Sequence, residues 1–517
     1  MQDSPAYQRN HEEIIKALEE GIFYLEALEP KAARLDQYGQ IQTLVCQKRV
    51  QDAEGNWQNS EEEIVLPARA IFVATGAKPN VAYEFEHKGH FERHSLFQYQ
   101  PHHDIQGRLQ AISAAEHCKI PDFGPFTSYE HTDHRITFIG DTHPAFHGSV
   151  VKAVASGMRT YPHIVKALSQ KIASTAQQER IENNNLGDIL QPRIEQIQRH
   201  SPNIIELHIR APLAAKKYQP GQFFRLQNYE TQAPIVGQTR LQTEALALRC
   251  AGIDREKGLL SFMILEQGAS SRLCATFRPG QPIALMGPTG VPTKIDDGGE
   301  TIMIIGGPIA SADIRTLGPA LRNAGNRVLY IAHFQSAEDV YNQAALEAAA
   351  DAIVWITASG KPIPVNRPQD CSITSDFLET LTRYAKGDLS DTPPAIPLQE
   401  ITRVHIIGSH RLVRLIQQAR QSTLRDYLTQ SPQCIASIHG PMQCMLKGVC
   451  AQCLQWQIDP KTKKRTKAVF ACSWQDQPLD MVDIDNLDER LSQNRVQEVI
   501  SNLWLDYLFE HHEIERV

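Results

Sequence analysis

Apolar and polar residues follow several patterns along the chain, and each pattern predicts a different kind of element. In the first 170 residues, helical spacing joins Ile14, Ile15, Leu18 and Ile22, and apolar runs predict strands at Ile41–Arg49, Ile64–Val73 and Arg135–Ile139. A helix is expected over Ser149–Leu168, with core contacts at Val150, Val151, Val154 and Ile164. Residues 171–191 are polar with few apolar anchors, which predicts a linker.

The pattern changes after residue 191. Short alternating runs, separated by turn signals at Pro220-Gly221, Pro279-Gly280 and Gly287-Pro288, predict an antiparallel β-barrel over 192–292. Over 299–430, apolar runs alternate with helical stretches such as Ser409–Arg420, which predicts an α/β domain with a parallel sheet. The expected strands are Thr301–Ile305, Arg327–Ile331, Ala352–Ile356 and Val404–Ile407. The predicted fold class is therefore multidomain α/β plus β-barrel.

Composition and charge narrow the functional classes. The 517 residues suggest three or four domains at about 150 residues each, and 42% hydrophobic residues exclude disorder for most of the chain. The 52 Lys and Arg face 59 Asp and Glu, a net charge of −7, so no broad basic field is present to attract nucleic acid. No apolar stretch approaches the roughly 18 residues of a membrane helix, and the N-terminus lacks a signal-peptide pattern. A cytoplasmic protein is expected.

Four cysteines gather near the C-terminus, within a small domain expected over 435–482. Cys444, Cys450, Cys453 and Cys472 follow the spacing C-x5-C-x2-C-x18-C, which in a reducing cytosol favours metal binding over disulfides. Iron–sulfur clusters and structural zinc both take four thiolates, so the ligand set alone does not decide between them. Three close cysteines and a distant fourth favour the plant-type [2Fe–2S] arrangement. Cys434 is interpreted as a bystander, and 483–517 as a helical segment with an amphipathic stretch over Arg495–Leu508.

The cysteine segment is similar to a known family. Met442–Cys453, followed by Phe470-Ala471-Cys472, resembles the cluster loop of the dihydroorotate dehydrogenase electron transfer subunit, within the ferredoxin–NADP reductase superfamily. The resemblance covers about residues 192–482. It implies an FAD-binding barrel, a NAD-binding α/β domain and a [2Fe–2S] domain, in that order. One extra residue between the first two cysteines and a longer gap to the fourth alter the loop shape more than the ligand count.

The same resemblance assigns flavin contacts to four motifs of the barrel. Pro220-Gly221-Gln222-Phe223 resembles the turn into a flavin-facing strand, and Arg249-Cys250-Ala251-Gly252-Ile253 lines up with R-P-x-S-I, whose arginine suits a diphosphate. Gly268-Ala269-Ser270-Ser271 resembles G-x-G-T, and Gly287-Pro288-Thr289-Gly290 the closing G-P-x-G turn. The implied FAD-binding residues are Arg249, Cys250, Gly252, Gly268, Ser270, Ser271, Gly287 and Gly290.

The nucleotide loop departs further from the family. Gly306-Gly307-Pro308-Ile309-Ala310 stands in place of G-G-G-x-G, where glycine amides let a pyrophosphate approach a helix N-terminus. Pro308 removes a donor and Ala310 adds a methyl group, and the family's C-G-P appears as Ile407-Gly408-Ser409. Gly306 and Gly307 are the candidate contacts to NAD(P)H. The alternative is a retained fold whose nucleotide site is poor or lost.

Residues 1–170 resemble a second family. Leu66–Pro79, then Phe138-Ile139-Gly140-Asp141 with Gly148–Ala153, resembles the closing FAD motifs of glutamate synthase small-subunit-like flavoproteins, which implies FAD contacts at Gly140 and Asp141. No G-x-G-x-x-G fingerprint precedes them. A partial FAD/NAD(P)-binding oxidoreductase module is therefore expected, completed by a missing N-terminal lobe or by a partner oxidoreductase subunit. The alternative is a remnant that binds nothing.

Together these interpretations predict an NAD(P)H-dependent electron-transfer flavoprotein. Electrons would enter from a pyridine nucleotide or a partner flavin, pass through FAD and leave through a [2Fe–2S] cluster, since a hydride brings two electrons and the cluster carries one. No catalytic acid or base is assigned, and neither nucleic acid nor a membrane span is expected. The alternative is a non-catalytic docking or regulatory subunit with structural zinc at the four cysteines. Dihydroorotate oxidation is not assigned, because nothing here resembles the subunit that performs it.

Overall fold

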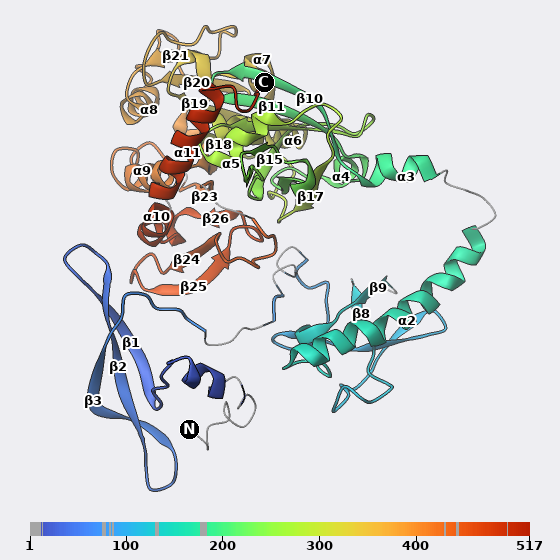
Figure 1. Cartoon of the computed structure of the whole chain (residues 1–517). Coiled ribbons are helices and arrows are strands. Elements are labelled where there is room, and N and C mark those ends of the chain that lie inside the picture. The colour runs from blue at the N-terminus through green and yellow to red at the C-terminus, as the bar shows by residue number, and fades with distance from the viewer. Residues whose placement is uncertain are drawn as a thin grey trace. The chain divides into compact units, whose positions relative to one another are not determined.

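The computed structural model describes residues 12, 14–74, 79–81, 84, 87–129, 134–175, 183–428, 431–440, 444–493 and 495–517 (Figure 1). Two compact units make up the chain, Met1–Lys78 and Pro79–Val517. The division falls inside the range 1–170, for which the sequence predicts one module. Thr75–Lys78 of the predicted N-terminal flavin motif, and Met442 and Gln443 of the cluster motif, lie outside the described residues.

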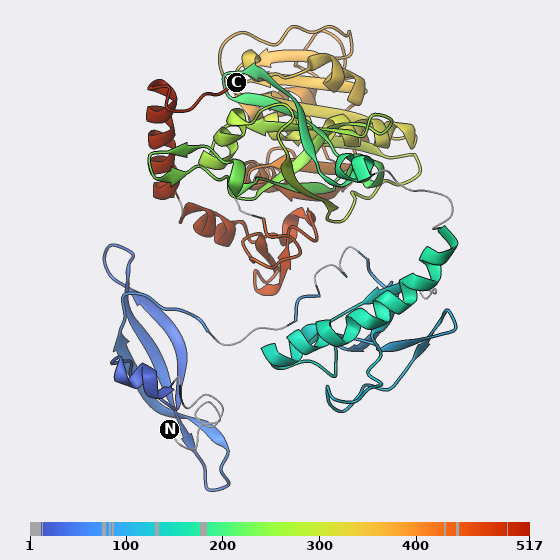
Figure 2. The same ribbon diagram turned by 45° about the vertical axis from the view of Figure 1, so that its right-hand side comes forward.

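The first unit is built on a three-stranded antiparallel sheet, in the order β1-β2-β3 (Figure 2). Its strands are β1 (Leu28–Leu35), β2 (Ile41–Gln51) and β3 (Trp57–Pro67). The prediction of β2 is confirmed, whereas the strand predicted over Ile64–Val73 is wrong in its bounds. Asp52 explains the early start of β3, because its carboxylate accepts the backbone N–H groups of Glu54 and Asn56 and turns the chain back at once.

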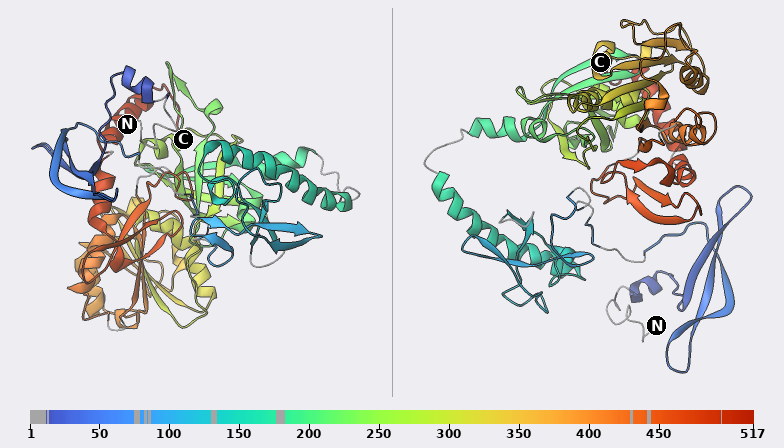
Figure 3. Two further views of the ribbon diagram at one scale, coloured as in Figure 1. Left: turned by 90° about the horizontal axis from the view of Figure 1, so that it is seen from below. Right: turned by 180° about the vertical axis from the view of Figure 1, so that it is seen from behind.

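Residues 79–190 form small sheets beside one long helix, α2 (Val150–Thr175) (Figure 3). β4 (Arg93–Ser95) pairs with β5 (Gln98–Tyr99), and a second sheet has the order β7-β6-β8-β9. Its strands are β6 (His102–Ile105), β7 (Arg108–Ala111), β8 (Phe126–Tyr129) and β9 (His134–Thr137). α3 covers Asn183–Leu190, so helix occupies most of the described part of the predicted linker.

The helix prediction over Ser149–Leu168 is confirmed, but three of its predicted core contacts are wrong. Val150, Val151 and Val154 are 79%, 79% and 60% exposed. The buried positions of α2 include Ser156 and Thr160 instead. The Ser156 hydroxyl accepts the N–H of Gly140, so this helix packs partly through polar groups that bond to backbone, which an apolar periodicity does not reveal.

Residues 192–292 form a six-stranded antiparallel sheet in the order β10-β11-β16-β15-β12-β17. Backbone hydrogen bonds from Ile194 to Gln281 and from Gly280 to Ile194 join the first strand to the segment before the last, so the sheet closes on itself. Apolar side chains of alternate positions fill its interior, as at Phe224 and Phe262. The strands are β10 (Arg193–Ser201), β11 (Ile204–Arg210), β12 (Phe223–Asn228), β15 (Leu246–Asp254), β16 (Leu259–Leu265) and β17 (Ile283–Thr289).

A seven-stranded sheet follows, in the order β21-β20-β19-β18-β22-β23-β26. The four predicted strands are confirmed as β18 (Thr301–Gly306), β19 (Arg327–Phe334), β20 (Ala352–Thr357) and β22 (Arg403–Gly408), all parallel to their neighbours. β21 (Cys371–Thr374) and β23 (Gln433–Ile438) extend the parallel set, and β26 (Asp476–Pro478) adds one antiparallel edge. The helices are α6 (Pro308–Asn323), α7 (Gln343–Ala349), α8 (Phe377–Lys386) and α9 (His410–Gln421).

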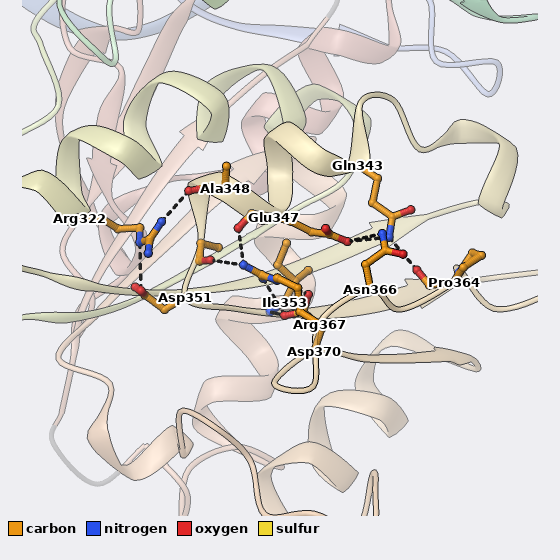
Figure 4. A network of polar contacts seen from close by, with 11 residues as sticks. Arg322, Gln343, Glu347, Ala348, Asp351, Ile353, Pro364, Asn366, Arg367 and Asp370 are labelled. Atoms are coloured by element: carbon orange, nitrogen blue, oxygen red, sulfur yellow. Dashed lines mark hydrogen bonds and ion pairs between the residues drawn. The ribbon is translucent and has the colours of Figure 1, made fainter.

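A polar network fixes the segment between β20 and β21 (Figure 4). Arg367 donates to both carboxylate oxygens of Asp370 at 2.7 Å and to the Ala350 carbonyl at 2.9 Å. Asp370 also accepts the N–H of Ile353 at 2.8 Å. Each of these charges is satisfied by a neighbour, so the network serves the fold rather than a reaction.

The C-terminal region carries the cysteines and two helices. β24 (Leu454–Ile458) pairs with β25 (Arg465–Phe470), and α10 (Ile484–Ser492) and α11 (Arg495–Glu510) follow. The apolar face of α11 packs through Leu505 and Leu508 on Leu241 and on Leu273 of α5 (Ala269–Leu273). Among the described residues, no helix has the length and apolar character needed to cross a membrane.

Candidate redox site

Three of the four predicted cysteine ligands share one buried cluster. The side chains of Cys444, Cys453 and Cys472 pack against Phe223 of the closed sheet, and Cys450 is half-buried nearby in the chain. Burial raises the pKa of the Cys444 thiol to about 11. A hydrogen bond with Cys472, together with burial, raises the pKa of Cys453 as well. A cation is therefore needed to hold these groups as thiolates.

Backbone N–H groups point at these sulfur atoms. The amide of Gly448 donates to Cys472 Sγ at 3.0 Å, and the amide of Cys472 lies 3.4 Å from Cys453 Sγ. Leu446, Lys447 and Gly448 have φ values of 63°, 50° and 74°, an unusual left-handed run that turns successive amides to one side. Such donors stabilise the negative charge of sulfur ligands.

The donor set of the cysteine loop fits a four-thiolate metal centre in type and burial. In the described part of the chain, no three or more His, Cys, Asp or Glu side chains stand at metal-holding separations. The cysteine loop therefore fits a metal centre in its ligand type, its burial and its amide donors, and not in the separations of its side chains. Both [2Fe–2S] and zinc satisfy it.

The cysteine segment is anchored directly on the closed sheet. Cys444 donates its N–H to the carbonyl of Ala245 at 2.9 Å, and Arg225 of β12 donates to the carbonyl of Cys444 at 2.9 Å. Three residues beyond Cys472, Gln475 donates to the carbonyl of Gly221 at 3.0 Å. A redox group on these cysteines would thus sit against the strand that follows the Pro220-Gly221 turn.

Close packing requires two glycines of the predicted G-P-x-G flavin turn. A Cβ atom at Gly290 would lie 2.0 Å from Gln475 Nε2, and Gly290 has a φ of 88°. A Cβ atom at Gly287 would lie 2.7 Å from the ring of Phe224. The G-P-x-G turn therefore has a packing role of its own, whether or not a flavin lies beside it.

Arg249 occupies a buried position on β15 and faces the α/β domain. Its guanidinium donates to the Gly221 carbonyl and lies 3.8 Å from the carboxylate of Asp313 on α6. Burial alone would raise the pKa of Asp313, but the charge of Arg249 and the contact with His439, whose Nε2 lies 3.4 Å from the carboxylate, lower it below the ordinary value. The predicted diphosphate ligand is therefore also the cation that ties the closed sheet to α6.

The side chain of Cys250 is turned into the interior of the closed sheet. Its thiol bonds to the Gly252 carbonyl at 3.1 Å, and burial raises its pKa to about 12. A ligand on the outer surface of the sheet can therefore reach Cys250 only through its backbone. A Cβ atom at Gly252 would meet Ser261 at 3.5 Å, an ordinary contact distance.

The predicted G-x-G-T segment begins α5, with Gly268 as its N-cap. The hydroxyl of Ser271 accepts the N–H of Gly268 at 3.1 Å, and that of Ser270 accepts the N–H of Glu244 at 2.9 Å. Glu498 of α11 accepts the N–H of Ala269 at 3.4 Å. A carboxylate thus already lies at the start of the segment to which the resemblance assigns a flavin contact.

Packing also accounts for the glycines of the predicted nucleotide loop. A Cβ atom at Gly306 would lie 2.2 Å from that of Ala310 and 2.5 Å from the Ile407 carbonyl, and one at Gly307 would lie 2.5 Å from the His333 carbonyl. Pro308 stands at the first position of α6, where a missing N–H is tolerated. Close strand–helix packing requires these glycines even without a bound nucleotide.

Gly140 and Asp141 lie in a turn before α2. Gly140 has a φ of 65° and donates its N–H to Ser156, while Asp141 accepts the N–H of Gly148 at 2.8 Å. The Asp141 carboxylate is exposed and holds the loop that leads into the helix.

Sequence motifs miss a buried polar network between the closed sheet and the α/β domain. Asp476, four residues after Cys472, lies 3.4 Å from His405 and accepts the hydroxyl of Thr293 at 2.8 Å. Burial opposes ionisation of Asp476, but the charge of His405 and its hydrogen bond lower its pKa overall. Asp313 lies on the neighbouring α6. Asp313 is an acidic residue within an otherwise apolar stretch of helix, and this feature of the sequence could have indicated the buried polar network.

Comparisons with known proteins find local sequence homology for part of the chain. No protein-family model matches it. It is 26% identical over 519 residues to an uncharacterized protein of Rickettsia prowazekii, covering 97% of this chain and 55% of that protein. A 154-residue stretch is homologous to the Bacillus cereus dihydroorotate dehydrogenase B (NAD(+)) electron transfer subunit, at 26% identity over 29% of this chain and 56% of that protein. The chain thus spans about half the length of these relatives.

Solved structures that the chain resembles include two reductases. One is an NADH-dependent reduced ferredoxin–NADP oxidoreductase, at 17% identity and a TM-score of 0.48, covering 62% of this chain and 100% of that one. Another is a ferredoxin NADP+ reductase from Neisseria gonorrhoeae with bound FAD and NADP, at 21% identity and a TM-score of 0.33, covering 46% and 92%.

Proposed function

We propose that the chain is an electron-transfer flavoprotein in which FAD on the closed sheet and a [2Fe–2S] cluster on the four cysteines exchange electrons. The attachment of the cysteine segment to the closed sheet through Cys444, Arg225 and Gln475 is the observation that supports this. Homology to an electron transfer subunit agrees with it. The domains of the proposal are 192–292 for FAD, 299–430 for NAD(P)H and 435–482 for the cluster.

The residues of the chain have distinct roles in this proposal. Cys444, Cys450, Cys453 and Cys472 hold the irons as thiolates, and the amides of Gly448 and Cys472 offset the charge of the sulfurs. Phe223 excludes water between the cysteines and the sheet. Arg249 and the amides that begin α5 are the proposed ligands of the FAD diphosphate. The flavin, when bound, converts a two-electron hydride into single electrons.

Nucleotide binding is proposed at the Gly306-Gly307 turn, where β18 ends and α6 begins. A second flavin contact is proposed at Gly140 and Asp141, in a module that works together with a partner oxidoreductase subunit. At both sites, the packing and hydrogen bonds described above account for these residues as well as a bound ligand does.

Anaerobic purification tests the proposal. We expect a yellow-brown protein that releases FAD on denaturation, contains iron and acid-labile sulfide, and bleaches when NADH or NADPH is added. A colourless protein with one zinc per chain would contradict the proposal and favour the alternative, a docking or regulatory subunit with structural zinc. Titration with each nucleotide separately identifies the electron donor.

Replacement of the acid at the start of α5 is expected to strengthen FAD binding. Glu498→Gln removes a negative charge beside the Ala269 amide, where the proposal places a diphosphate. A gain of about two- to fivefold in FAD affinity follows from roughly 0.5–1 kcal/mol of relieved repulsion. The measurement is fluorescence titration of the apoprotein with FAD. Glu510→Gln, on the same helix, is the matched control, and an equal gain in both variants would contradict a diphosphate at this position.

A further inference from the structure

The hairpin formed by β24 and β25 (Figure 1) lies between Cys453 and Cys472 in the chain and is rich in basic residues. β24 begins directly after Cys453, and β25 ends two residues before Cys472, so the base of the hairpin lies at the thiols. Five of the seven residues at its tip and along its return strand, Lys461 to Lys467, are Lys or Arg. This concentration is local, because the chain as a whole carries a net charge of −7.

The cations at the tip are free to meet a partner. Lys461, Lys463 and Lys464 are exposed and form no ion pair within the part of the chain that the structure describes. Arg465 differs, since it lies 2.9 Å from Asp483 and stacks over Trp456. The tip therefore presents three lysine side chains over four residues, none of which forms an ion pair among the described residues.

The turn that carries these lysines is held in one shape. The carboxylate of Asp459 accepts the N–H groups of Lys461 at 2.9 Å and Thr462 at 2.7 Å, and the N–H of Asp459 donates to the Lys464 carbonyl at 2.9 Å. A surface that is already ordered loses little conformational entropy when it binds.

Apolar side chains lie exposed on the cysteine loop itself. Met445 and Val449, between Cys444 and Cys450, are 52% and 65% exposed. Protein interfaces commonly combine apolar and charged surface: the cysteine loop offers the first, and the hairpin that starts from this loop offers the second.

We propose that the lysine tip and the cysteine loop together dock a small acidic electron-carrier protein. The inference rests on the proposed function, because the partner would receive electrons from the group held by the cysteines. One electron crosses per encounter without forming or breaking a bond: the group on the cysteines is oxidised and the carrier is reduced. Because a hydride carries two electrons, one hydride supplies two successive encounters with the carrier. Brief encounters of this kind depend on charge complementarity for their rate and orientation.

Protein rather than nucleic acid is the partner that these observations favour. The positive charge is confined to one turn, whereas nucleic acid binding draws on a basic surface that follows many phosphates. The exposed Met445 and Val449 also suit a protein surface. At physiological salt, charges act over only about 8 Å, so the local charge of the tip outweighs the negative total.

Binding of an acidic flavodoxin to the full chain tests the inference. Lys463→Glu/Lys464→Glu is compared with Lys216→Glu/Lys217→Glu, which reverses two exposed lysines at the end of α4 (Pro212–Lys217). We expect the first pair to weaken flavodoxin binding about tenfold and to flatten its salt dependence, and the second pair to change it less than about twofold. Basic cytochrome c, the opposite-charge probe, is expected to gain affinity for the first pair.

The outcomes separate docking from the proposed function. NAD(P)H-dependent reduction of ferricyanide, a small acceptor, is expected to be equal in all three proteins, and its absence from all three would overturn the proposed function alone. Equal weakening by both lysine pairs would overturn the docking surface, since it would reflect net charge. Binding of a single-stranded oligonucleotide that depends on Lys463 and Lys464, without flavodoxin binding, would assign the turn to nucleic acid instead.

Discussion

Cys450→Ser is expected to abolish the iron–sulfur centre and leave FAD in place. Four thiolates hold the proposed cluster, and a serine oxygen replaces the most accessible of them. Iron should fall from about two atoms per chain to near none. The attachment of the cysteine segment to the closed sheet runs through Cys444, Arg225 and Gln475, none of which is changed. NADH reduction of ferricyanide should therefore persist, while reduction of a one-electron carrier protein is lost.

Cys434→Ser is the matched control for this experiment. Cys434 is buried outside the cluster, and its sulfur accepts a hydrogen bond from Arg420 at 3.2 Å that a serine hydroxyl can replace. Iron, sulfide and visible absorbance should remain unchanged in this variant. Equal iron loss in both variants, or full iron in Cys450→Ser, would contradict the assignment of the four ligands. Loss of FAD together with iron would show that the closed sheet and the cysteine segment fold as one unit.

Local chemistry made parts of this structure predictable. The central strands β18, β19, β20 and β22 are buried on both faces, so their apolar runs are visible in the sequence. Cys444, Cys453 and Cys472, which lie close together in the sequence, also share one buried cluster, while metal binding by the four cysteines stays a prediction.

Long-range packing made other parts unpredictable. The core face of α2 was misassigned because Ser156 and Thr160 bury hydroxyls there while Val150 and Val151 are exposed. The flavin contact of Gly290 stays a prediction, and the sequence does not reveal that Gly290 is also required by Gln475, a residue 185 positions later. Contacts between residues so far apart leave no local pattern in the sequence. The pairing of Arg249 with Asp313 could not be predicted for the same reason.

Arg249→Leu is expected to destabilise the chain strongly. It leaves the buried carboxylate of Asp313 without its nearest guanidinium, and removal of one partner of a buried ion pair costs about 3–5 kcal/mol in the free energy of unfolding. Arg278→Leu, which breaks an exposed pair with Glu515 at 3.4 Å, is the matched control and should cost less than about 1 kcal/mol. Urea unfolding, followed by tryptophan fluorescence at neutral pH, measures both.

A double substitution and a pH series distinguish the ion pair from a general packing defect. Arg249→Leu/Asp313→Leu should recover much of the lost stability, because apolar side chains replace both charges. In the unmodified chain Asp313 has a lowered pKa, so its stabilising effect is present above the unfolded pKa of about 3.8 and is lost as the pH falls. In Arg249→Leu, burial without the guanidinium raises the pKa of Asp313. Protonation of Asp313 at lower pH then relieves the cost of a buried carboxylate that has lost its guanidinium.

The stability difference between Arg249→Leu and the unmodified chain should therefore narrow as the pH is lowered. Arg249 is also the proposed diphosphate ligand, so Arg249→Leu should weaken FAD binding, whereas Arg278→Leu should not. The ion pair would be contradicted if the double variant were no more stable than Arg249→Leu and if the stability difference between Arg249→Leu and the unmodified chain did not change with pH. Unchanged FAD affinity in a folded Arg249→Leu would assign Arg249 to domain attachment alone.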